Sequence, residues 1–280
     1  MNPALTPTPD QLDPLWNWLR RLCLVGAVLA VCILGASILL RLTTVLDAQG
    51  NAVSLLEPAL EHAVRTLHRV CASGVALLAL CAFALCWRAR RTDVKVMPPA
   101  VSIVASTVVL ALIGPLTSGY RLGSITVVNV TFGMVLSMAF WWLREIIITA
   151  MEGPTHTRSP PDRLSWLTFG AMVLHLGTGA AASAWEMHGI HWPAYVHLVS
   201  LLLCLILVGV LLFGPRPTKV LSDRVTALAA LLAAQLVVGG LLMWQDPRPV
   251  ALSYFHAMLS PLVAMAAVTI MVRGANRRQR

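Results

Sequence analysis

The chain has 280 residues, of which 58% are hydrophobic and only 12% are charged, and its mean hydropathy is +0.76. Soluble domains usually contain about 25% charged residues, so this composition excludes an ordinary soluble protein. The net charge is +9, and the basic residues lie mostly at the ends of apolar runs. That distribution predicts membrane orientation, and nucleic acid is not an expected partner.

Eight apolar runs are each long enough to cross a bilayer, which takes roughly 20 residues of helix. They predict helices because only helices and closed barrels satisfy their backbone groups in lipid. The first run is too long, and the tail before it too acidic, for a cleavable signal peptide. The predicted spans are 22–44, 60–87, 99–119, 124–146, 165–187, 192–213, 223–244 and 252–272.

The first half of the chain begins with a predicted cytoplasmic tail, residues 1–21. The first span carries Arg41 to the outer face, and the outer loop that follows contains the turn signal Gln49-Gly50-Asn51. The second span starts near Pro58, which suits a first helical turn. In its outer turns it presents ionisable side chains at Glu61, His62, Arg65, His68 and Arg69.

The third span contains Gly114-Pro115, a short outer turn carries Arg121, and the fourth span has Asn129 near its outer end. A Pro- and Ser-containing segment then divides the chain at its midpoint. We therefore predict two four-helix bundles, 22–150 and 165–273, joined by a cytoplasmic linker over 151–164 and followed by a basic cytoplasmic tail over 274–280.

Basic residues are distributed unevenly between the two predicted sides. With a cytoplasmic N-terminus, 16 of the 21 lie inside. This asymmetry follows the positive-inside rule and predicts that both termini are cytoplasmic. The five outer ones are Arg41, Arg65, Arg69, Arg121 and Arg248.

The two halves have the spacing of a repeat. His68 and His197 are 129 positions apart, and Asn129 and His256 are 127 apart. Each half contains an even number of spans, so both halves run in the same direction. We therefore expect a parallel repeat about an axis along the membrane normal.

Three histidines, His68, His197 and His256, lie about one turn inside the outer ends of their spans, and Asn129 takes the fourth equivalent place. An ionisable side chain in a membrane helix is costly, so each is a functional candidate. His197 and His256 lie at matching depth, as two axial ligands of one haem would. Small residues near these positions (Ser200, Ser260, Ala72 and Gly133) would leave room for the macrocycle. The outer arginines Arg41, Arg69, Arg121 and Arg248 suit haem propionates.

A histidine in a membrane helix need not bind a cofactor. A single one can simply form a hydrogen bond to a neighbouring helix, and His175, which has no repeat partner, is interpreted as a packed polar residue. His62 is interpreted as a solvated or interfacial side chain. A transporter built from parallel repeats is a further alternative, although the spans lack acidic residues at mid-membrane for ion coupling.

The whole chain resembles the haem A synthase family. The resemblance rests on a pattern of short motifs that runs through both halves: Gly35…Arg41-Leu42-Thr43, His68-Arg69, Gly114…Thr117, then Gly177…Gly179, His197, Gln235…Gly239-Gly240 and His256. It implies an all-α membrane protein with eight transmembrane helices in two pseudo-symmetric four-helix bundles. The implied reaction is oxidation of the C8 methyl group of haem O to the formyl group of haem A.

The resemblance also assigns roles to residues. His197 and His256 would bind haem b in the C-terminal half, and His68 would bind the substrate haem. Glu61, one turn before Arg65, is the candidate catalytic carboxylate, which could partly replace the acidic residue usual in the family. The sequence departs from the family at Asn129, where a His is usual, and at Arg65, where an acidic residue is usual. Outer-loop cysteines common in the family are also absent. The alternative is a non-catalytic bis-His haem b membrane protein for electron transfer or haem handling.

The resemblance further implies partners and a location. Haem O and its synthase, membrane lipids, an electron donor, terminal oxidase assembly factors and a second copy of the chain are the expected partners. The expected location is the bacterial cytoplasmic (inner) membrane, with multiple passes.

Overall fold

The computed structural model describes residues 9–46, 52–90, 93–117, 123–152, 163–185, 192–214, 219–245 and 248–273. The described chain contains eight helices long and apolar enough to cross a membrane, which confirms the predicted all-α, eight-span fold. Arg121, most of the 151–164 linker and the 274–280 tail lie outside the described residues. The helices are α1 (Pro9–Leu42), α2 (Pro58–Ala89), α3 (Met97–Thr117), α4 (Gly123–Met151), α5 (Arg163–Trp185), α6 (Trp192–Phe213), α7 (Lys219–Met243) and α8 (Val250–Arg273).

Helix α1 begins much earlier than the sequence predicted. The segment expected as a tail up to residue 21 is helical from Pro9. Trp16 and Leu19 of this extension lie on the same face of α1 as Cys23, and all three are buried in the bundle core. Spacing of three and four residues places such side chains on the same side of a helix, so packing extends the helix beyond the apolar run.

The loop after α1 contains a short hairpin that the sequence did not predict. Strand β1 (Thr44–Leu46) pairs antiparallel with β2 (Ala52–Ser54), and Thr44 lies opposite Ser54. Strands of three residues carry too little pattern to be recognised in a sequence. A 3-10 helix, η2 (Val94–Val96), precedes α3.

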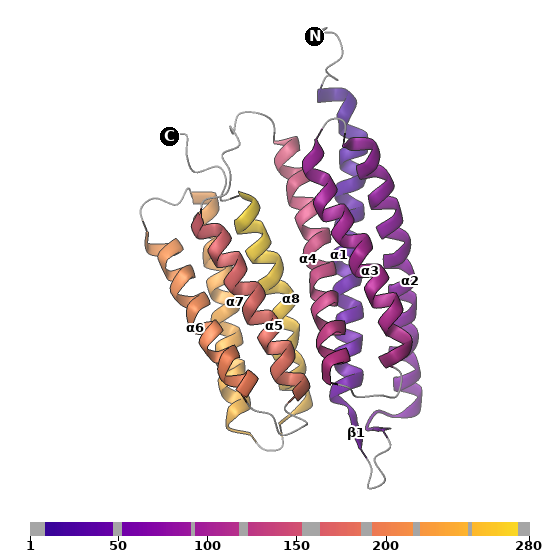
Figure 1. Ribbon diagram of the computed structural model, residues 1–280, viewed down its shortest axis with the longest axis vertical. Helices are drawn as coiled ribbons and strands as arrows, with labels where there is room; N and C mark the ends of the chain where they lie inside the picture. The colour runs from indigo at the N-terminus through magenta and orange to yellow at the C-terminus, as the bar shows by residue number, and fades with distance from the viewer. Residues whose placement is uncertain are drawn as a thin grey trace.

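Each half is an antiparallel four-helix bundle in which consecutive helices are neighbours (Figure 1). Helix α1 starts and α8 ends at the same end of the molecule, here called the terminal end. The opposite end carries β1 and β2 and is called the hairpin end. Each bundle closes on itself, because α1 also packs against α4, and α5 against α8.

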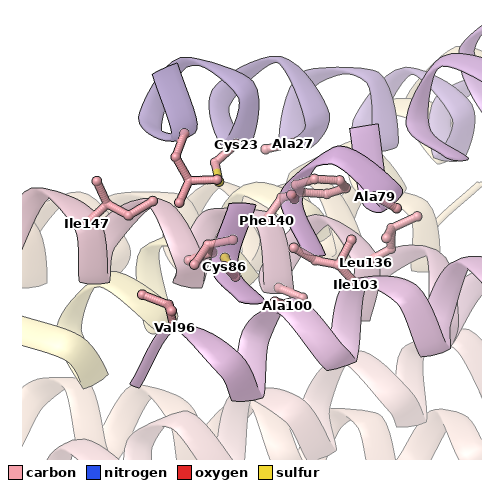
Figure 2. Close-up of a cluster of buried hydrophobic side chains, with 14 of the residues drawn as sticks. Cys23, Ala27, Ala79, Cys86, Val96, Ala100, Ile103, Leu136, Phe140 and Ile147 are labelled. Carbon is pink, nitrogen blue, oxygen red and sulfur yellow. The ribbon is translucent and has the colours of Figure 1, made fainter. Parts of the chain in front are cut away.

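The N-terminal bundle has a dense core toward its terminal end. Figure 2 shows side chains from α1, α2, η2, α3 and α4 meeting around Phe140, which is fully buried. Gly26 of α1 makes room for this ring, since a Cβ at position 26 would lie 2.5 Å from it. The C-terminal bundle has its own core, built around Leu228, Leu232 and Val263.

The two bundles meet where α4 packs against α8 (Figure 1). Trp141 Nε1 donates to Thr269 Oγ1 at 2.8 Å, and Arg273 Nε donates to Glu145 Oε2 at 2.7 Å. Both pairs are 128 positions apart in sequence. In a twofold contact, equivalent positions face each other at the axis. These contacts therefore agree with the parallel repeat predicted from the sequence.

Candidate functional site

His197 of α6 and His256 of α8 face each other inside the C-terminal bundle, near the hairpin end. Their ring centres are 6.4 Å apart and their planes are nearly perpendicular, at 86°. Two imidazoles that bind one metal ion from opposite sides, with bonds of about 2.0 Å, have ring centres roughly 6 Å apart. The separation therefore suits a single metal atom between the two rings.

The His197 ring is held in the tautomer that metal binding needs. Its Nδ1 lies 3.0 Å from the backbone carbonyl oxygen of His175. A carbonyl only accepts, so Nδ1 carries the proton and Nε2 keeps its lone pair. The His256 imidazole lies beside the backbone carbonyl of Gln235, although its buried Nδ1 atom forms no hydrogen bond of ordinary geometry. Each imidazole thus has a backbone carbonyl beside it on the neighbouring helix.

Two glycines make room for these rings. A Cβ at Gly179 of α5 would lie 2.8 Å from Cε1 of His197, and a Cβ at Gly239 of α7 would lie 3.0 Å from Cε1 of His256. Carbon atoms do not normally approach so closely, so a larger residue at either position would displace the imidazole. The site therefore depends on the absence of a side chain at two matched places.

The α5–α6 and α7–α8 helix pairs carry the same arrangement of residues. His175 Nδ1 lies 3.2 Å from Ser200 Oγ, and Gln235 Nε2 donates to Ser260 Oγ at 3.0 Å. In each pair the two residues are 25 positions apart, and a glycine follows the first by four positions. In the sequence, Gln235 and the two glycines belong to the motif pattern of the resemblance, but no contact with the histidines was predicted for them. The repeated spacing of 25 and four would have revealed them.

His175 belongs to this site. It is 0% exposed, as expected for a packed polar residue, and its ring is stacked on that of His197, with ring centres 4.2 Å apart and planes within 8°. Its Nε2 atom is buried without a hydrogen bond. The sequence predicted its burial but not its position against a candidate ligand.

The N-terminal half is arranged differently. Asn129 lines a cavity of about 20 Å³ together with residues of α1, α3 and α4, and Gly133 lies beside it. Such a volume holds about one water molecule. His68 of α2 is partly exposed and does not line this cavity. No described contact brings His68 and Asn129 together as the C-terminal histidines are brought together.

Glu61, the expected catalytic carboxylate, is paired with Arg65. Arg65 Nη2 lies 2.6 Å from Glu61 Oε1, one helical turn away on the exposed end of α2. The Glu61 carboxylate is therefore already paired with Arg65.

The arginines that are expected to pair with the haem propionates differ in how deeply they are buried. Arg41, in the last turn of α1, is half-buried, and its Nη1 atom is buried without a hydrogen bond. Arg69 and Arg248 are exposed. Of these three, Arg41 is the one with buried donor capacity left for an anionic group.

Comparison with protein families and with curated proteins found no relative of this chain. No protein-family model matches the chain, and no curated protein is significantly similar to it. Among the described residues, no three His, Cys, Asp or Glu side chains converge on a common point as a metal site. A haem needs only two such ligands from the protein, because the porphyrin supplies the other four.

Proposed function

We propose that the C-terminal bundle binds haem b, with His197 and His256 as its two axial ligands. The observation that carries this proposal is the 6.4 Å separation of their rings, which are both partly buried inside the C-terminal bundle. The glycines at 179 and 239, which leave room for the two rings, add support. A haem held by two histidines supplies one-electron transfer.

The residues around the ligands bind and orient the group. The backbone carbonyl of His175 fixes the tautomer of His197 and makes its Nε2 atom a stronger ligand for iron. Arg41 and Arg248 lie toward the hairpin end, where they would pair with propionates through charge-assisted hydrogen bonds. The charge asymmetry of the sequence supports cytoplasmic termini. The resemblance supports a location in the bacterial inner membrane.

For the chain as a whole we propose a haem A synthase-type oxidoreductase that converts haem O into haem A. This rests on the motif pattern that spans both halves. The N-terminal half would take the substrate at His68, and Glu61 would need to leave Arg65 to act there. Haem O would come from its synthase, and the product would serve terminal oxidase assembly.

A second candidate is a haem b protein without methyl oxidation. The observation that favours it is the N-terminal half itself, where Asn129 borders space for about one water and Glu61 is held in an ion pair. An amide is a poor ligand for iron because its nitrogen lone pair is delocalised. On this alternative the N-terminal bundle is structural, and electrons pass through the C-terminal bundle only.

Haem extraction separates the two candidates. The protein would be expressed with a source of haem O, and the extracted haems would be resolved by chromatography and mass. Haem A in the wild type that disappears in His68→Ala, while haem b remains, supports the synthase. Haem b alone in both proteins supports the second candidate. A protein that carries neither haem contradicts both.

A further inference from the structure

His175 of α5 and Gln235 of α7 are buried polar side chains that the proposed ligation does not use. They are 0% and 2% exposed, and the two side chains are neighbours. His175 Nε2 and Gln235 Oε1 are both buried, and neither atom forms a hydrogen bond of ordinary geometry. Unpaired polar atoms inside a membrane bundle are costly, because neither lipid nor the core offers them a partner.

The protonation of His175 follows from its other contact. Ser200 Oγ donates to the carbonyl of His197 at 2.7 Å, so its oxygen acts as the acceptor toward His175 Nδ1 at 3.2 Å. His175 Nδ1 therefore carries the proton, and Nε2 presents a lone pair. That lone pair needs an N–H donor, and Gln235 is the neighbouring side chain that has one.

Gln235 satisfies both orphaned atoms when its amide nitrogen faces His175. Turning the amide by 180° exchanges its oxygen and nitrogen with almost no change of shape. In the structure, the amide nitrogen of Gln235 lies 3.0 Å from Ser260 Oγ. After the turn, the amide oxygen takes that place, and the Ser260 hydroxyl can donate a hydrogen bond to it. A continuous chain of hydrogen bonds, Ser260–Gln235–His175–Ser200, then crosses the bundle.

We propose that His175 is a positioning residue for the haem b site, held by Gln235 from across the bundle. The chain joins α8 to α6, the two helices that carry His256 and His197. The His175 ring, stacked 4.2 Å from that of His197, then prevents the ligand ring from rotating about its Cβ–Cγ bond. This inference rests on the proposed haem site and extends it to residues that do not touch iron.

The test uses His175→Phe, Gln235→Leu and the double variant in the full-length protein. Phe keeps a planar ring for stacking but forms neither hydrogen bond, and Leu removes the partner. Thr168→Val is the matched control, because the buried Thr168 hydroxyl bonds to the carbonyl of Leu164 in its own helix. Thermal unfolding and the electron paramagnetic resonance (EPR) g-values of the ferric low-spin haem are measured for each protein.

Each single variant should lower the unfolding midpoint, and the double variant should lose less than the sum, because one bond is shared. The g-values should shift in both singles and stay unchanged in the control. If the losses of stability in the two single variants add up to the loss in the double variant, His175 and Gln235 share no hydrogen bond. This comparison is valid whether or not the protein contains haem. Coupled losses with unchanged g-values overturn the positioning role. A wild type without haem removes the proposed function and the positioning role together, whereas the coupling still reports the hydrogen bond.

Discussion

Glu145 of α4 and Arg273 of α8 occupy equivalent positions of the two halves and form an ion pair, with Arg273 Nε 2.7 Å from Glu145 Oε2. If both positions carried glutamate, or both carried arginine, two like charges would face each other. The divergence to an acid and a base therefore makes the two halves complementary. Arg144 and Arg224 also approach Glu145, at 3.1 and 3.7 Å.

Loss of the Glu145 carboxylate should weaken the contact between the bundles. Its side chain is 2% exposed, so Glu145→Gln removes the one acidic group that Arg144, Arg224 and Arg273 share, although Arg273 keeps Glu152 as a partner. Breaking a buried ion pair on one side costs about 3–5 kcal/mol. Thermal unfolding in detergent measures the loss.

Arg65→Gln is the matched control for this variant, because it breaks an ion pair on the exposed end of α2. It should change the unfolding midpoint little. The exchange Glu145→Arg with Arg273→Glu should recover part of the stability that either single exchange loses. Equal behaviour of Glu145→Gln and Arg65→Gln would show that the buried pair does not hold the halves together.

The two glycines at the histidine rings predict a position-specific effect. Gly179→Ala and Gly239→Ala should each displace an imidazole and reduce haem occupancy, because the new Cβ would lie 2.8 or 3.0 Å from Cε1. Haem content per protein, from the absorption spectrum, measures this.

The same helices supply the controls. At Gly177 and Gly240 a Cβ would meet nothing within 4 Å. There, Gly→Ala should leave haem content unchanged and favour the helix by about 1 kcal/mol. Haem loss that is equal at all four positions would argue against specific contact with the rings.

The expected topology makes a further prediction about orientation. Reporters inserted after Thr92 and after Gly189 should label opposite sides of the membrane, with Thr92 in the cytoplasm. The reason is the excess of basic residues on the side of the termini. Labelling of both insertions on one side is incompatible with eight spans in alternating directions.

The sequence predicted what depends on composition and on long-range spacing. Eight spans, two parallel halves and the approach of His197 to His256 all follow from apolar length and matched depth. The extension of α1 to Pro9 was not predictable, because it depends on tertiary packing of Trp16 and Leu19 rather than on hydropathy. The hairpin strands were too short to leave a signal.

Of the candidate site, the sequence predicted only the two proposed ligands, His197 and His256. A single buried His without a repeat partner gave no sign that His175 would stack on His197. Its counterpart in the second helix pair is a glutamine, and the substitution hides the relationship from a search for repeated histidines. Asn129 is the opposite case, because the sequence identified the residue but not its surroundings. The sequence marked it as a departure, and only the structure shows that the space beside it holds about one water.

The central claim is that His197 and His256 hold one haem b between them, and the spectrum of the purified protein tests it most directly. Optical absorption and EPR should show a six-coordinate, low-spin haem b that is lost in both His197→Ala and His256→Ala. The exposed His62 provides the control, and His62→Ala should retain the full signal. A wild type without haem, or a low-spin signal that survives unchanged in both single variants, would contradict the account.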